Sequence, residues 1–486
     1  MSKQFWNPSF HIEPRQGWLN DPNGLCQFRG RYHAYYQYAP NWPTDELKYW
    51  GHVVSDDLIS WEDLGVALAP DIQLDRSGVF SGCTWVDKGG APDGGDLMRV
   101  FYTGNVVDTF DDERVDWGRE ANQIMTTSEN GLHFSPKKAL LTNADYPTSC
   151  TLHVRDPTVW EQDGCLHMLL GARQRGPLDT DNPDARGDFG SVLVYDSHDK
   201  GESWRLRRTI LPKNTTVAHL VFGYMWECPN VIRMGDREFL AVCPQGLPSE
   251  SYRWQNLWQA GYFPLPAHEK IIDIDAVPLD NFTEWDHGFD FYAPQIFTDE
   301  RGRTISIGWM GTFDHSYTSV PEGMDRAHTM TLPREITLGA DGLLRQRPVT
   351  ELDNYRGEAR ALPCGKSLVS DSLAADVILK QIEDGDAQIW LNDVLEVFVE
   401  SGSFGIRFAQ TEAGALASAG RRSRSIRLES LDDLRMIVDG STIEIYVNGG
   451  AEVFSTRWFP LSDRLTIRNS FRARSSFVYP LIKPTR

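Results

Sequence analysis

The stretch Trp18-Leu19-Asn20-Asp21-Pro22-Asn23-Gly24 opens the first of several segments that repeat along the chain. Pro22 fixes its own φ angle and Asn23-Gly24 tolerates a corner, so the stretch alone predicts a tight turn with Asp21 at its first corner. An aspartate in such a turn usually has only a capping role. However, Arg155-Asp156-Pro157 and Trp226-Glu227-Cys228 place acidic residues at similar points of later segments of comparable length. Three acidic residues in register indicate a site.

The repeat has two alternating elements. Short strand-like runs dominate from residue 18 to about 338. One element is a polar turn that leads into an aromatic residue, and it recurs about every 70 residues. Its aromatic residues are Trp61, Phe134, Trp204 and Trp285. We interpret these four as core residues that pack between the repeated units. The other element comprises Asp21, Ser81-Gly82, Asp156, Glu227 and Tyr292-Ala293-Pro294-Gln295. Four-stranded units repeated around an axis are typical of a β-propeller, whose first strands converge on the axis.

The pattern predicts an all-β fold in two parts. Five units fit between residues 18 and 338, so we expect a five-bladed β-propeller catalytic domain over residues 1–338 and a polar linker over 339–360. Residues 361–486 are expected to form a C-terminal β-sandwich, with Asp439-Gly440 as a hairpin signal between two alternating runs. No comparable set of carboxylates occurs there, so we expect a structural role or homo-oligomer contacts for the sandwich.

Composition limits the partners. The net charge of −20 argues against nucleic acid and anionic membranes, and slightly favours an uncharged substrate. No run approaches the ~18 apolar residues of a membrane helix. Seven scattered cysteines without a CxxC pair are typical of reduced thiols, and with the apolar-poor N-terminal stretch they predict a cytoplasmic protein. The sequence predicts no metal site and no cofactor.

The three acidic residues suit glycoside cleavage. Two carboxyl groups that face each other across a glycosidic bond suffice, one as nucleophile and one as proton donor. Glu227, between Trp226 and Cys228, is expected in the more apolar setting and hence as the donor. Asp21 would remain ionised and attack the anomeric carbon, and Asp156, next to Arg155, would stabilise positive charge in the transition state. A plain ion pair for Asp156 or a buried arginine partner for Glu227 is the structural alternative.

Aromatic and amide side chains near the unit starts suit a sugar ligand. Sugar faces stack on aromatic rings, and sugar hydroxyls need amide or hydroxyl partners. Candidate substrate-binding residues are Asn20, Gln37, Trp50, Phe80, Ser81 and Trp309. Core packing is an equally good interpretation of Trp50 and Trp309.

These motifs together resemble glycoside hydrolase family 32, the family of invertases and β-fructofuranosidases. The segments that carry the resemblance are 18–24, 32–37, Trp50-Gly51-His52, Phe80-Ser81-Gly82, Arg155-Asp156-Pro157, Glu227-Cys228, 290–295 and Leu332-Pro333-Arg334-Glu335. The resemblance implies a retaining mechanism with Asp21 as nucleophile, Asp156 as transition-state stabiliser and Glu227 as general acid/base. It also implies a fructose subsite lined by Asn20, Gln37, Phe80, Ser81, Arg155 and Trp309.

Two departures from the family pattern concern the site. Cys83 stands where serine is commoner. The segment Asn41-Trp42-Pro43-Thr44-Asp45-Glu46-Leu47-Lys48-Tyr49 lacks the Trp-Gly-Asn run that relatives often carry, so Trp42 is a substitute at the rim of the sugar pocket. The segment is expected at the part of the pocket that binds the leaving sugar, so the change bears on substrate preference.

Several functions remain open at this level. The main expectation is hydrolysis of terminal β-D-fructofuranosides such as sucrose and short fructo-oligosaccharides, through a covalent fructosyl intermediate. Sucrose 6-phosphate is the alternative substrate. An inverting arabinan-degrading propeller would also use three acidic residues. A sialidase is disfavoured because no arginine triad is evident, and a sugar-binding propeller without activity would need no proton donor.

Overall fold

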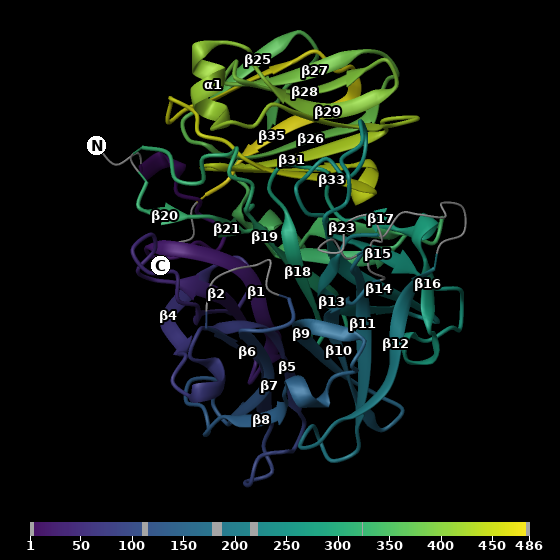
Figure 1. Cartoon of the computed structure of the whole chain (residues 1–486). Helices are drawn as coiled ribbons and strands as arrows, with labels where there is room; N and C mark the ends of the chain where they lie inside the picture. The colour runs from purple at the N-terminus through teal and green to yellow at the C-terminus, as the bar shows by residue number, and fades with distance from the viewer. Residues whose placement is uncertain (1–3, 109–114, 177–186, 214–221, 323, 483–486) are drawn as a thin grey trace.

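The computed structural model describes residues 4–108, 115–176, 187–213, 222–322 and 324–482. Within these ranges, five sheets surround a common axis, and two six-stranded sheets follow them in the chain. In Figure 1 the propeller occupies the lower part of the molecule and the sandwich lies above it. The all-β architecture expected from the sequence is confirmed.

The propeller strands run outward from the axis in chain order. The first blade contains β1 (Gly17–Phe28), β2 (Arg31–Ala39), β3 (Tyr49–Ser55), β4 (Trp61–Leu68) and the late strand β20 (Arg326–Ala327). The second contains β5 (Val79–Asp87), β6 (Leu97–Val107), β7 (Arg119–Ser128) and β8 (Lys138–Leu141). The third contains β9 (Cys150–Gln162), β10 (Cys165–Gln174), β11 (Phe189–Ser197), β12 (Arg205–Lys213) and β16 (Ala276–Pro278).

The last two blades are less regular. The fourth contains β13 (Met225–Met234), β14 (Arg237–Gln245), β15 (Gly261–Pro264) and β17 (Thr283–Glu284). The fifth contains β18 (Tyr292–Thr298), β19 (Thr304–Met310), β22 (Arg334–Leu338) and β23 (Leu344–Pro348), with β21 (Thr329–Met330) against β19. Because β20 pairs with β1 in parallel, residues 326 and 327 join the two ends of the propeller.

The inner strand of every blade carries a bulge at the same place. The pairing register shifts in β1, β5, β9, β13 and β18, next to a Pro or Gly in each strand. The dipeptides before that Pro or Gly are Asn20-Asp21, Phe80-Ser81, Arg155-Asp156, Glu227-Cys228 and Tyr292-Ala293. Proline cannot donate to the ladder, and a bulge changes the direction of nearby side chains. The predicted turn at Asp21 is therefore wrong: the residue lies in a bulged strand.

The residue after each Pro or Gly links its blade to the next one. Three of these side chains accept a hydrogen bond from a backbone amide: Asn23 Oδ1 from Gly82 (3.0 Å), Cys83 Sγ from Val159 (3.1 Å) and Gln295 Oε1 from Leu25 (2.7 Å). The other two donate to a backbone carbonyl: Thr158 Oγ1 to Pro229 (2.6 Å) and Asn230 Nδ2 to Pro294 (3.0 Å). We call these five residues the inter-blade ring. A cavity of about 390 Å³ lies along the following parts of the same strands. The dipeptides precede the ring, so they lie on its other side.

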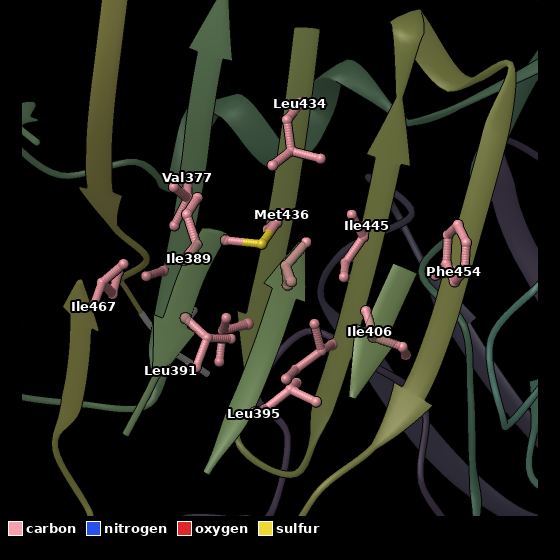
Figure 2. Close-up of a cluster of buried hydrophobic side chains, with 14 of the residues drawn as sticks. Val377, Ile389, Leu391, Leu395, Ile406, Leu434, Met436, Ile445, Phe454 and Ile467 are labelled. Carbon is pink, nitrogen blue, oxygen red and sulfur yellow. The ribbon is translucent and has the colours of Figure 1, made fainter. Parts of the chain in front are cut away.

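The sandwich follows the expected hairpin pattern. One sheet contains β24 (Arg360–Ala361), β35 (Ala473–Pro480), β26 (Ala374–Ile382), β31 (Asp433–Asp439), β32 (Thr442–Val447) and β33 (Glu452–Arg457). The other contains β25 (Lys366–Ser370), β34 (Leu465–Asn469), β27 (Ala387–Leu391), β28 (Leu395–Glu400), β29 (Ser403–Phe408) and β30 (Ser423–Arg427). Aliphatic side chains from both sheets form one buried core (Figure 2).

Helices are short throughout the described residues. The α-helix α1 (Glu412–Ser418) begins with Thr411 as its N-cap, whose side chain accepts a hydrogen bond from Gly414 N. The 3₁₀ helices are η1 (Gln4–Trp6), η2 (Gln73–Asp75), η3 (Asn143–Asp145), η4 (Ile271–Asp273), η5 (Leu279–Asn281), η6 (Thr350–Tyr355) and η7 (Asn448–Gly450). No helix among the described residues has the length and apolar character needed to cross a membrane.

The boundary between the two parts stays a proposal. We expected the propeller to end at residue 338 and a polar linker to follow over residues 339–360. In the structure β23 pairs with β22 along Leu344–Pro348, and η6 comes next. This pairing favours a boundary after Pro348.

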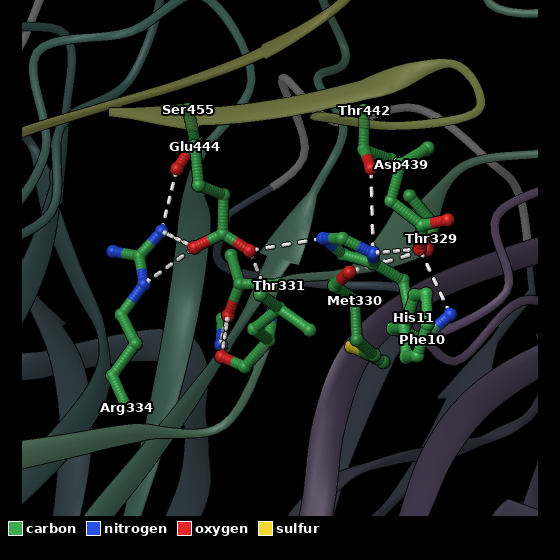
Figure 3. A network of polar contacts seen from close by, with 12 residues as sticks. Phe10, His11, Thr329, Met330, Thr331, Arg334, Asp439, Thr442, Glu444 and Ser455 are labelled. Atoms are coloured by element: carbon green, nitrogen blue, oxygen red, sulfur yellow. Dashed lines mark hydrogen bonds and ion pairs between the residues drawn. The ribbon is translucent and has the colours of Figure 1, made fainter. Parts of the chain in front are cut away.

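A buried polar cluster joins the propeller to the sandwich (Figure 3). Arg334 of β22 forms an ion pair with Glu444 of β32 at 2.6 Å. His11 bridges the same glutamate (3.0 Å) and Asp439 (2.7 Å). Burial opposes the charge on His11, but the hydrogen bonds to Asp439 and Glu444 prevail and raise its pKa to about 9. The cluster thus ties the start of the chain and the fifth blade to the sandwich.

Candidate active site

Asp21 belongs to a hydrogen-bond network of amide and hydroxyl side chains on the first two blades. Its Oδ1 accepts from Asn20 Nδ2 at 2.9 Å and its Oδ2 from Ser81 Oγ at 2.7 Å. Gln37 joins these partners, because its Oε1 accepts from Asn20 and its Nε2 donates to Ser81 Oγ. Both carboxylate oxygens are therefore fixed in direction, as a nucleophile requires.

Asp156 is held by a side-chain hydroxyl of the second blade and a backbone amide of the fourth. Its own amide donates to Thr103 Oγ1, and its Oδ2 accepts from the amide of Cys228 at 3.0 Å. Its φ angle is +66°, a left-handed conformation that is uncommon for residues other than glycine. The cost of this conformation indicates that the fold dictates the direction of this carboxyl group.

Glu227 has polar partners on both oxygens. The Nε and Nη2 atoms of Arg155 approach its Oε1 at 2.8 and 2.7 Å, as a fork. Its Oε2 accepts from Gln245 Nε2 and from the hydroxyl of Tyr292, both at 2.7 Å. The apolar setting expected from the flanking Trp226 and Cys228 is wrong, since the Trp226 ring points into a buried apolar cluster instead. Arg155 pairs with Glu227 and not with the adjacent Asp156.

The three carboxyl groups form one electrostatic unit. The thiol of Cys228 lies 3.8 Å from Asp21 Oδ2 and 3.7 Å from Asp156 Oδ2, so these two groups share a neighbour. Burial, and then the charge of Glu227, raise the pKa of Asp21. The same two causes raise the pKa of Asp156 to about 7. Among the described residues, Arg155 is the one cation in direct contact with the three carboxyl groups. Because one cation does not balance three negative charges, the cluster favours retention of a proton near neutrality.

The predicted sugar-binding residues divide into two groups. Asn20, Ser81 and Arg155 contact the carboxyl groups directly, and Gln37 contacts Asn20 and Ser81. Phe80 precedes Ser81 and is partly exposed, whereas the Trp50 ring has 0% exposure and its Nε1 donates to the Phe80 carbonyl. The expectation that Trp50 contacts sugar is therefore corrected: it packs in the core and supports Phe80.

Trp309 lies beside the site, although its ring is also buried. Its ring centroid is 6.4 Å from that of Tyr292 and 6.2 Å from that of Trp18. Its indole Nε1 is buried without a hydrogen-bond partner among the described residues. A donor in that state is available to a ligand, so a role for Trp309 in sugar binding stays a proposal.

Two residues that contact Glu227 were not predicted as site residues. Tyr292 occupies the same bulge position in the fifth blade as Glu227 does in the fourth, and its place in the repeated element was the signal for it. Gln245 ends β14, and only the pairing register of β13 with β14 places it near Glu227. No local motif marks it.

One further group of potential metal ligands lies on the third blade. Cys165, His167 and Asp196 are close together on β10 and β11. His167 Nδ1 is 2.7 Å from Asp196, and Arg207 pairs with the other oxygen of that carboxylate. These internal pairs account for the Asp196 carboxylate, so the cluster does not indicate a metal centre.

Comparison with known proteins agrees with this geometry. The model of the glycosyl hydrolases family 32 N-terminal domain matches residues 11–348, and that of the family 32 C-terminal domain matches 396–477. A Bacillus subtilis protein named sucrose-6-phosphate hydrolase is 34% identical over 96% of this chain and 91% of its own length. An Escherichia coli raffinose invertase is 34% identical over 94% of this chain and 90% of its own.

A solved structure extends the likeness to the whole fold. Sucrose-6-phosphate hydrolase from Lactobacillus gasseri superposes with a TM-score of 0.81 at 26% identity, covering 99% of this chain and 94% of that one. Five bulged inner strands, three convergent carboxyl groups and two matching domain models lead to one conclusion. The chain belongs to glycoside hydrolase family 32 and is a fructosidase.

Proposed function

We propose that this protein is a retaining β-fructofuranosidase whose preferred substrate is sucrose 6-phosphate. The observation that carries the activity is the contact of one thiol with Asp21 and Asp156, next to a Glu227 held by Arg155. The phosphorylated substrate is supported by the names of the Bacillus subtilis and Lactobacillus gasseri relatives. The raffinose invertase among the relatives supports unphosphorylated sucrose and its oligosaccharides as the alternative.

The net charge had favoured the unphosphorylated sugar. Charges on a protein surface are screened over about 8–10 Å at physiological ionic strength. A phosphate group at the site therefore responds to the few charges within that distance and not to the total of −20. The relatives outweigh the overall charge as a guide to the substrate.

The proposed reaction has two displacements at the fructosyl C2 atom. Asp21 attacks C2, the bond from C2 to the glucosyl oxygen breaks, and Glu227 gives its proton to that oxygen. Glu227 then takes a proton from water, the water oxygen attacks C2, and Asp21 leaves as a carboxylate. Asp156 stabilises positive charge on the sugar ring in both steps.

Proton donation by Glu227 requires a rearrangement of its contacts. In the free protein Glu227 accepts three hydrogen bonds, from Arg155 Nε, Gln245 and Tyr292, and Arg155 Nη2 lies at ion-pair distance. A bound sugar that accepts hydrogen bonds from Arg155 would loosen this fork. Glu227 is then free to act as the proton donor toward the leaving oxygen.

Substitution of the carboxyl groups tests the activity. We expect Asp21→Ala and Glu227→Ala to lower kcat by several orders of magnitude and to leave the circular dichroism spectrum unchanged. Asp56→Ala is the matched control, because the Asp56 side chain is 80% exposed and remote from the site. Near-normal turnover in both site variants contradicts the proposal.

The stereochemical course distinguishes the retaining enzyme from the inverting alternative. Retention releases β-fructofuranose first, and methanol as acceptor gives the β-methyl fructoside. Proton NMR of the first turnovers measures both products. Initial release of the α-anomer would establish inversion and exclude Asp21 as the nucleophile.

Location and assembly are secondary parts of the proposal. All seven cysteines are free thiols, which suits a reducing compartment such as the cytoplasm. Homo-oligomer contacts through the sandwich remain a proposal that light scattering tests directly.

A further inference from the structure

Lys48 is a half-buried cation next to the carboxyl cluster that the proposed mechanism does not use. It directly precedes β3, and its carbonyl accepts from the amide of Val79, two residues before Ser81. Its Nζ lies 5.3 Å from the centre of the Trp18 ring. The backbone bond fixes the base of the side chain, and the aromatic ring supports its cationic end.

Lys48 lacks the anionic partner that other nearby cations have. Arg155 pairs with Glu227, Arg173 with Asp188 and Arg326 with Glu13, whereas no carboxylate lies within ion-pair distance of Lys48 in the described ranges. Burial lowers the pKa of Lys48 to about 8, against the opposing effect of the Glu46 and Asp21 charges. A partly desolvated cation without a counter-ion costs free energy, and a bound anion removes part of that cost.

Lys48 lies on the side of the site where the leaving sugar would bind, and not where the fructosyl group would bind. The inter-blade ring closes the axis on the inner side of Asp21, so the leaving sugar must extend toward the partly exposed Trp18 and Trp42. These two rings lie 5.4 Å apart. Lys48 lies over the Trp18 ring, and it belongs to the same 41–49 segment that contains Trp42.

We propose that Lys48 binds a phosphate ester on the leaving sugar and thereby sets the preference for a phosphorylated substrate. This inference rests on the proposed function. A lysine ammonium is a compact point charge that suits a phosphate dianion. Trp18 and Trp42 would stack on the apolar face of the sugar ring while Lys48 holds its charged substituent. The departure of segment 41–49 from the family pattern then has a function in selectivity.

The test is a comparison of kcat/KM for sucrose 6-phosphate and for sucrose. Lys48→Met keeps the length and removes the charge, and Lys48→Arg keeps the charge. We expect Lys48→Met to lower the ratio of the two kcat/KM values by at least about tenfold, mainly through KM of the phosphorylated substrate. Lys48→Arg should retain most of the ratio. Lys138→Met, at an exposed ion pair with Glu202, is the matched control.

Product inhibition separates a bound ester from a free anion. We expect glucose 6-phosphate to inhibit the wild type more strongly than Lys48→Met, and inorganic phosphate to inhibit both weakly. An unchanged ratio in Lys48→Met overturns the role of Lys48, as does an equal loss for both substrates. A wild type that prefers sucrose overturns the proposed phosphorylated substrate as well. Wild-type preference for sucrose 6-phosphate that persists in Lys48→Met overturns the inference alone.

Discussion

At the scale of single residues, the bulges explain how side chains of different chemical types from five blades come to lie in one site. The backbone at each bulge fixes the direction of two side chains, and the residue type then decides the chemistry. The second residue of the dipeptide is an aspartate at Asp21 and Asp156. In the fourth blade it is Cys228, whose thiol lies close to both aspartates. The arrangement supplies three acidic groups and their donors from separate blades.

The first prediction concerns the titration of Asp156. Its pKa of about 7 arises from burial and then from Glu227. Glu227→Gln removes that negative charge and frees Arg155, and both changes favour the ionised form of Asp156. We therefore expect the pKa of Asp156 to fall in this variant, measured by carbon NMR of labelled aspartate carboxyl groups. An unchanged or higher value contradicts the electrostatic coupling.

The second prediction concerns the hydroxyl of Tyr292. It donates to Glu227 Oε2 at 2.7 Å, so Tyr292→Phe removes one donor and keeps the ring. We expect kcat to fall by about ten- to a hundredfold, because Glu227 then loses part of its fixed orientation. Tyr38→Phe is the control, since Tyr38 lies on β2 of the first blade and has no contact with Glu227 among the described residues. Steady-state kinetics on both variants measures the difference, and equal rates refute the role.

At the scale of elements, the inter-blade ring holds the inner strands in register with one another. Each link uses a side chain directly after the bulge, so the same short motif positions the site and closes the propeller. Cys83 provides the weakest link, because a thiol is a poor hydrogen-bond acceptor.

The third prediction concerns one link of this ring. Thr158→Val removes the hydroxyl that donates to Pro229 O and leaves that carbonyl without this partner. We expect a loss of about 1–3 kcal/mol in the free energy of unfolding, measured by urea denaturation. Thr158→Ser retains the hydroxyl and should lose less. Equal stability of the valine variant and the wild type would show that the link carries no net energy.

Much of this organisation could be predicted from the sequence. The spacing of Asp21, Asp156 and Glu227 indicated a propeller, and the Asp439-Gly440 signal indicated the β31–β32 hairpin, whose register the structure bears out. The turn at Asp21 and the apolar setting of Glu227 were wrong, since local residue types do not reveal a bulge or long-range partners. Gln245 is near Glu227 only through strand register, and Trp50 faces the core, which no local pattern could decide.

At the scale of the whole molecule, buried charges join parts of the chain that are far apart in sequence. His11, Arg334 and Glu444 come from the first segment, the fifth blade and the sandwich. Because each charge has a partner of opposite sign, removal of one leaves another uncompensated in a low-dielectric interior.

The fourth prediction concerns this cluster. His11→Ala should lower the free energy of unfolding by about 3–5 kcal/mol, whereas His268→Ala, at an 81% exposed side chain, should have little effect. The pKa of His11 in the folded protein, about 9, exceeds the ordinary histidine value of 6.5. Its contribution to stability is therefore complete below pH 6.5 and is lost as the pH rises toward 9. Denaturant titrations at several pH values measure this, and a pH-independent difference between wild type and His11→Ala contradicts it.

The same cluster has a consequence for synthesis on the ribosome. Asp21 emerges first, and β20 and the partners of His11 follow more than three hundred residues later. A nascent chain that has all three acidic groups still lacks the strand that fastens its first blade and the anions that neutralise His11. We expect that such a chain stays inactive until residue 444 has left the exit tunnel.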